Sequence, residues 1–180
     1  GMQAMLQRLF DSGVPLSQWV VNLGAGDGRC EAGDEYDPAN CLVLESSWHG
    51  VFVEADRNLA EFARDRVNQS GRGGAIIVPN AVTPQSVMDV VRGAERALLA
   101  RLRMTDPGLV SLRAPDLLKV DLDYADCDFV ESLVAALEPL LVHVEINPLF
   151  PPPVSYRERF RGLGRARLVD SEHHLIGCSL

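Results

Sequence analysis

The chain has 180 residues, 47% of them hydrophobic and 23% charged, a composition typical of one soluble globular domain. Its net charge of −8 argues against a nucleic-acid-binding protein, because such a surface needs clustered lysine and arginine. No apolar run is long enough to span a membrane, and no signal peptide follows residues 1–2, whose Gly-Met start resembles a cleavage scar. We therefore expect a single cytoplasmic domain over residues 1–180, without nucleic-acid or membrane partners.

The cysteines share no Cys-x-x-Cys spacing and lie in unrelated sequence contexts, at Cys30, Cys41, Cys127 and Cys178. This distribution favours reduced, mostly buried thiols over a zinc site or a disulfide framework. We assign no metal ligand among them.

The first elements in the chain are a helix and a strand. Residues 3–12 carry apolar side chains at helical spacing, and the apolar run from Trp19 predicts a buried parallel strand that ends in glycines. Gly24, Gly26 and Gly28 would let the backbone turn sharply and approach a ligand where a Cβ would collide. The alternative is an ordinary glycine-rich turn.

The residue after this turn weakens one interpretation of it. Arg29 stands where the dinucleotide fingerprint Gly-x-Gly-x-x-Gly needs its third glycine, so a pyrophosphate site is disfavoured. Residues 29–40 are acidic and rich in turn formers, and they predict a loop. Asp34, Glu35 and Asp37 could coordinate a cation, but we favour a solvated acidic loop. Pro38 is expected to open a short helix through residue 45.

A carboxylate ends the second predicted strand. Residues 50–56 are largely apolar and include Glu54, followed by Ala55. In nucleotide-binding α/β domains, a carboxylate at this place accepts hydrogen bonds from the ribose hydroxyls. The alternative is a solvated acid at a strand end, and the preceding glycine turn favours the ribose role.

The middle of the chain continues the alternation. Residues 58–68 predict a helix, residues 75–78 a third buried strand, and residues 84–102 a long amphipathic helix. Asn80 and Ala81 follow the third strand, where a small or polar residue commonly faces the base of a bound cofactor. A turn or helix cap is the equal alternative for Asn80.

Charged residues alternate along the fourth predicted strand, residues 117–122. Lys119, Asp121 and Asp123 share one face of it, an arrangement that is costly unless the groups are paired or functional. Lys119 and Asp121 could neutralise each other, whereas Asp123 falls where substrates bind in such sheets. Asp126 or Asp128 is expected to cap the next helix, residues 129–137.

The fifth predicted strand, residues 140–146, leads into Asn147 and a triple proline. Glu145 and Asn147 share a face, so with Asp121 and Asp123 they could converge near the reactive end of a cofactor. The tail beyond residue 155 carries an arginine-rich patch. Such a patch could receive an anionic substrate, but more often it is a solvated face.

Taken together, these motifs resemble the class I S-adenosylmethionine-dependent methyltransferases, and within them the FkbM-like O-methyltransferases. The matching segments are VVNLGAGDG, GVFVEAD, IIVPNAVTP, LLKVDLDYADCD and VHVEINPLFPPP, spread over residues 17–153. The resemblance implies an α/β, Rossmann-like, doubly wound and mostly parallel sheet with helices on both faces. Such folds close with two further edge strands, and the chain stops at HLIGCSL, so we expect it to lack them. An exposed edge strand would favour a homodimer.

The resemblance also implies roles for the candidate residues. Residues 24–28, with Ala25, would approach the methionine moiety, Glu54 would hold the ribose, and Asn80 with Ala81 would meet the adenine. The Asp121 region would lie near the transferable methyl group.

We therefore expect transfer of a methyl group from S-adenosylmethionine to the hydroxyl of a small molecule or sugar. Asp123 or Glu145 would serve as the base, and Asn147 would orient the acceptor. A divalent cation on Asp121, Asp123 and Asn147 is an alternative way to acidify the hydroxyl. The rival functions are a non-catalytic cofactor-binding or interaction domain and a nicotinamide-dependent oxidoreductase.

Overall fold

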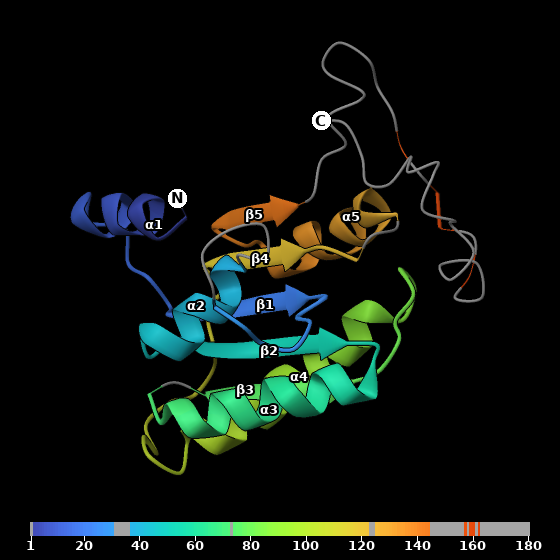
Figure 1. Cartoon of the computed structure of the whole chain (residues 1–180). Coiled ribbons are helices and arrows are strands. Elements are labelled where there is room, and N and C mark those ends of the chain that lie inside the picture. The colour runs from blue at the N-terminus through green and yellow to red at the C-terminus, as the bar shows by residue number, and fades with distance from the viewer. Residues whose placement is uncertain are drawn as a thin grey trace.

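The computed structural model describes residues 2–30, 37–72, 74–122, 125–144, 157, 159–160 and 162. In this part of the chain five parallel strands form one sheet, in the order β3-β2-β1-β4-β5. Figure 1 shows the arrows pointing the same way, with helices in front of the sheet and behind it. The predicted α/β, Rossmann-like and doubly wound architecture is therefore confirmed.

The bounds of the elements follow the predicted alternation of strand and helix. The strands are β1 (Trp19–Leu23), β2 (His49–Glu54), β3 (Gly74–Pro79), β4 (Leu117–Val120) and β5 (Leu141–Val144). The helices are α1 (Met2–Asp11), α2 (Pro38–Glu45), α3 (Arg57–Ser70), α4 (Val87–Leu102) and α5 (Asp126–Leu137). The predicted and observed ends of these elements differ by a few residues at most.

Two hydrophobic clusters cover the two faces of the sheet. Trp19, Val21 and Leu23 point to one face and pack with the buried sides of α4 and α5. Val20 points to the other face and packs with α1, α2 and α3. Every residue of β1 is buried, because a central parallel strand has both faces covered. This explains why its sequence is a continuous apolar run, interrupted only at Asn22.

The start of α5 differs from the prediction. Ala125 is the N-cap, with a φ of 55°, and no side chain caps the helix, so the expected capping role of Asp126 or Asp128 is wrong. The Asp126 carboxylate instead accepts a hydrogen bond from the backbone N–H of Leu122 at 3.0 Å. Asp128 has a long-range partner, Arg157.

Residues 157 and 160 bind to α5. Arg157 donates to the Asp128 carboxylate and forms an ion pair with Glu131 on the next turn of the helix. The backbone N–H of Phe160 donates to Asp128 Oδ2 at 2.8 Å, and its ring meets Phe129 edge-on at 5.8 Å between ring centres. We call this set of contacts the α5 clasp. Arg157 is thus paired within the protein, which contradicts its assignment to a solvated arginine patch.

The α5 clasp makes part of the free energy of unfolding depend on pH. Burial would raise the pKa of the Asp128 carboxyl, but the Phe160 N–H and the Arg157 guanidinium outweigh it and hold this pKa below its usual value. The stabilisation is therefore fully present above the ordinary carboxyl pKa of about 4 and is lost as pH falls through the lowered value. We expect Arg157→Gln to lower the free energy of unfolding by about 1–2 kcal/mol at pH 7, and by progressively less as the pH falls below about 4.

Urea unfolding at a series of pH values measures this difference. Arg159→Gln is the matched control: its side chain is 69% exposed and lies 3.7 Å from Asp128, so we expect a loss of about 0.5 kcal/mol or less. If the loss of stability in Arg157→Gln did not change with pH, the ion pair between Arg157 and Asp128 would not be its cause.

Candidate functional site

The candidate site lies at the carboxyl ends of β1, β2 and β4. The strand order reverses between β1 and β4, the place where open α/β sheets leave a crevice for ligands. Gly24, Gly26 and Gly28 follow β1, and all have positive φ, between 56° and 77°. Most residues avoid this conformation, which explains the glycine spacing.

Two of the glycines are also required by close packing. A Cβ on Gly24 would lie 1.8 Å from the carbonyl oxygen of Asp121, and one on Gly28 would lie 2.7 Å from Cα of Ala63 in α3. A Cβ on Gly26 would meet nothing within 4 Å. The glycine turn, residues 24–28, is therefore pressed between β4 and α3 at its ends and open in its middle.

Glu54 braces the open middle of the turn. Its Oε2 accepts a hydrogen bond from the backbone N–H of Gly26 at 2.8 Å, and its Oε1 accepts one from Asp56 at 2.9 Å. Each carboxylate oxygen can accept a second hydrogen bond, so the half-buried side chain keeps acceptor capacity toward the open side. Ala55, beside it, is exposed. Glu54 is thus tied to the glycine turn and available to a ligand.

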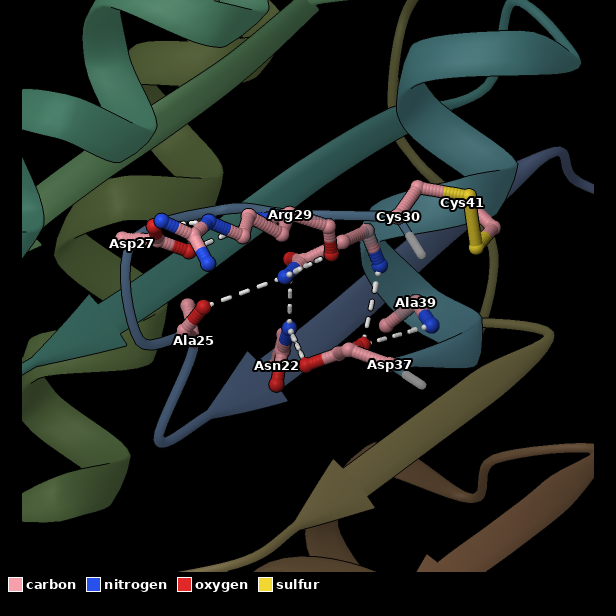
Figure 2. Close-up of a disulfide and its surroundings, with 9 residues drawn as sticks. Asn22, Ala25, Asp27, Arg29, Cys30, Asp37, Ala39 and Cys41 are labelled. Carbon is pink, nitrogen blue, oxygen red and sulfur yellow. Dashed lines mark hydrogen bonds and ion pairs between the residues drawn. A yellow bond between two sulfur atoms is a disulfide. The ribbon is translucent and has the colours of Figure 1, made fainter. Parts of the chain in front are cut away.

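A network of buried polar side chains lies beneath the turn (Figure 2). The Asn22 amide on β1 donates to Asp37 Oδ2 and to Asn40 Oδ1, each at 3.0 Å. Asn40 in turn donates to the carbonyl oxygens of Ala25 and Arg29, both at 3.1 Å. The two ends of the turn are therefore tied to the first turn of α2.

Asp37 is the N-cap of α2. Its Oδ1 accepts hydrogen bonds from the backbone N–H groups of Ala39 at 2.8 Å and Asn40 at 2.9 Å. Asp37 is buried, so the expectation of a solvated acidic loop is wrong for this residue. The other acids of that segment, Asp34 and Glu35, lie outside the described residues.

Lys119 is the charged centre of the network. Its ammonium donates to the carbonyl oxygen of Gly24 and to Asp37 Oδ2, both at 2.9 Å, and lies 3.1 Å from a carboxylate oxygen of Asp121. The side chain is 4% exposed. Burial alone would lower the pKa of Lys119, but the two carboxylates outweigh this effect and raise it. The predicted pairing of Lys119 with Asp121 is present, and Asp37 is an additional partner.

Cys30 and Cys41 form a disulfide, with Cα atoms 4.7 Å apart. Cys127 is disulfide-bonded as well. The expectation of reduced thiols is therefore wrong, and among the described residues there is no free cysteine. Regular motif spacing could not reveal the first pair, because α2 brings Cys41 back over the end of the glycine turn (Figure 2).

The remaining predicted residues fall into three groups. Ala25 is 2% exposed, so its side chain packs in the core and only its backbone faces the turn. Asn80 and Ala81 are exposed just beyond β3, at the same edge of the sheet. Asp123, Glu145 and Asn147 lie outside the described residues, so their proposed convergence with Asp121 stays a prediction.

His143 on β5 is a further titratable group near the site. It pairs in register with Lys119, and its ring is half-buried. Burial, and then the Lys119 charge, lower its pKa, so the imidazole is neutral near pH 7. The sequence assigns His143 no role, because its position opposite Lys119 follows from the register of β4 and β5, which the sequence does not show.

Two negative findings apply to the described part of the chain. No set of three or more His, Cys, Asp or Glu side chains there gathers so that it could hold a metal ion. Nor does any described helix combine the length and apolar character needed to cross a membrane.

Comparison with known proteins adds no family assignment. No protein-family model matches the chain, and no curated protein or solved structure is similar enough to count as a match. The functional argument therefore depends on the geometry of the site.

The network yields a stability prediction. Lys119→Met would leave the buried Asp37 carboxylate without its charged partner, and we expect a loss of about 3–5 kcal/mol in the free energy of unfolding. Adding Asp37→Asn should recover part of this loss, because asparagine is also a good N-cap and carries no charge. Urea unfolding of the single and double variants measures the coupling.

Asp121→Asn is the matched control for the second carboxylate. Its side chain is 42% exposed, so we expect a loss of about 1 kcal/mol or less. Additive effects of Lys119→Met and Asp37→Asn would contradict the ion pair as the centre of the network.

Proposed function

We propose that the protein is an S-adenosylmethionine-dependent methyltransferase that modifies a hydroxyl of a small molecule or sugar. The observation that carries the proposal is the pairing of Glu54 with the open middle of the glycine turn at the switch point of the sheet. A carboxylate there suits the two hydroxyls of a ribose, and the open backbone at Gly26 leaves room for a ligand. The resemblance of the sequence motifs to such enzymes supports the same function.

The N-terminus of α2 favours a cofactor without a pyrophosphate. In dinucleotide-binding folds, phosphate is held by free backbone N–H groups at the start of the helix after the first strand. Here Asp37 already accepts from two of these N–H groups and places a negative charge beside them. Arg29, in place of a third glycine, forms an ion pair with Asp27 at 2.7 Å. These features disfavour a nicotinamide-dependent oxidoreductase.

The described residues fit S-adenosylmethionine in their chemistry. Glu54 would bind the ribose, exposed Asn80 and Ala81 would lie toward the base, and the backbone of the glycine turn would face the amino-acid part. The sulfonium cofactor supplies an electrophilic methyl group, so the protein's task is to align the acceptor and exclude water. Carboxylates such as Asp121 would also favour a cationic ligand at this edge of the sheet.

The base for the acceptor is proposed from sequence position. In the sequence, Asp123 follows β4 by a few residues, and Glu145 and Asn147 follow β5, and we propose that they act at the carboxyl edge of the sheet. Asp123 or Glu145 would accept the hydroxyl proton, and Asn147 would orient the acceptor. A divalent cation held by Asp121, Asp123 and Asn147 is the alternative means of activation.

The proposed cytoplasmic location limits the role that the Cys30–Cys41 disulfide can have. Stable disulfides are rare in the cytosol and common in oxidising compartments. A cytoplasmic protein with the Cys30–Cys41 bond would therefore use it transiently, as a bond that reductants open and close.

The first test is calorimetric titration of the protein with S-adenosylhomocysteine, with NAD titrated in parallel. We expect the former to bind with a dissociation constant of about 1 μM, roughly −8 kcal/mol, and no heat from NAD. Binding of NAD alone would overturn the proposal. Binding of neither would overturn it as well and favour a non-catalytic interaction domain.

A variant pair tests the role of Glu54. Glu54→Ala removes the proposed ribose acceptor, and we expect a loss of at least about tenfold in S-adenosylhomocysteine affinity, the cost of one or two hydrogen bonds to a charged group. Asp56→Asn is the control, because it removes a neighbouring exposed charge but keeps a residue that can cap α3. Equal affinities of the wild-type protein and Glu54→Ala would exclude the ribose assignment.

A further inference from the structure

The Cys30–Cys41 disulfide joins the end of the glycine turn to α2. Cys30 comes two residues after Gly28, and Cys41 follows Asn40, the side chain of which holds both ends of the turn. The bond therefore adds a covalent tie beside the hydrogen bonds of Asn40. Opening this bond would release Cys30 from α2.

The two sulfur atoms differ in access. Cys41 is 1% exposed, whereas Cys30 is partly exposed and lines a cavity of about 260 Å³. Arg29, Arg66 and Glu45 line the same cavity, and both arginines pair with Asp27. A guanidinium group beside a cysteine favours its thiolate, and Arg29 directly precedes Cys30 in the sequence.

We propose that the Cys30–Cys41 bond is a redox-controlled clasp on the cofactor site, separate from the α5 clasp. It is opened by a small-molecule or protein thiol that enters at Cys30. The thiolate attacks Cys30 Sγ, the S–S bond breaks, and Cys41 leaves as a thiolate that takes up a proton. A second thiol attacks the mixed disulfide, releases Cys30 as a thiol, and forms the oxidised disulfide of the reductant. Two electrons pass from the reductant to the protein, and oxidation reverses the sequence.

Reduction of the disulfide would change which contacts hold the glycine turn. The Lys119 network still holds Gly24, Arg66 still donates to the carbonyl oxygen of Asp27, and Asn40 still donates to Arg29. The covalent tie between Cys30 and α2 is lost. The turn then samples other conformations, and the fraction able to bind a ligand falls. This consequence rests on the proposed function, since it assigns the turn to a cofactor. We expect S-adenosylhomocysteine to bind roughly tenfold more weakly to the reduced form, as for a competent population of about one tenth.

The experiment measures the turn and the ligand separately. Hydrogen exchange of residues 24–30 is followed in the oxidised protein, in protein equilibrated with glutathione, and in the double variant Cys30→Ser with Cys41→Ser. The same samples are titrated with S-adenosylhomocysteine. Cys127→Ser is the control, because it removes the other described disulfide-bonded cysteine from α5 and should leave exchange in the turn unchanged.

Four outcomes are informative. Faster exchange confined to the turn, a mixed disulfide with glutathione at Cys30, and weaker ligand binding would support the clasp. Faster exchange in the turn with no ligand binding to any form would support the clasp and overturn the proposed function. Unchanged exchange with unchanged ligand affinity would overturn the clasp alone. Global unfolding on reduction, or resistance to glutathione in the folded protein, would also overturn it, because the disulfide would then be purely structural.

Discussion

The buried ammonium of Lys119 is the interaction on which the geometry of the site depends. An unpaired charge at this depth would be too costly to keep, so the fold must bring acceptors to all three of its N–H groups. It does so with Gly24 from the turn after β1, Asp37 from the start of α2, and Asp121 from the end of β4. Three segments that are far apart in the sequence are thereby fixed relative to one another. The glycine turn owes its position to this charge as much as to its own conformation.

The same network determines which ligands the site can accept. Asp37 balances Lys119 and also occupies the first N–H groups of α2, so the helix terminus that binds phosphate in related architectures is filled from within. Glu54 accepts hydrogen bonds from Gly26 and Asp56 and keeps further acceptor capacity toward the open turn. A carboxylate acceptor suits ribose hydroxyls, and the occupied helix terminus disfavours a pyrophosphate, so the proposed adenosyl sulfonium is compatible with the site.

Sequence patterns predict the fold well because its main determinants are local. Apolar runs such as Trp19–Leu23, periodic helices and glycines at strand ends each indicate their element within a few residues. The site was only partly predictable, because its partners are distant: Asp37 meets Lys119 across 82 positions, and Arg157 meets Asp128 across 29. Asp37 resembled an ordinary loop acid and Asp128 an ordinary helix cap. The local sequence does not show whether an acidic residue also pairs with a cation that is distant in the sequence.

Two restraints of different chemistry therefore act on one short segment. The ionic restraint at Gly24 is insensitive to pH over the physiological range, because the pKa of Lys119 is raised. The covalent restraint at Cys30 would respond to thiols. Gly26, whose N–H is bound by Glu54, lies between the two. Opening the disulfide would leave the start of the turn fixed and remove one restraint from its end, where Arg66 still binds Asp27. The loss of order would then reach Gly26 and Glu54 before it reaches β1. The proposed ribose acceptor is thus the part of the site that a change in redox state would affect first, while the sheet beneath it stays folded.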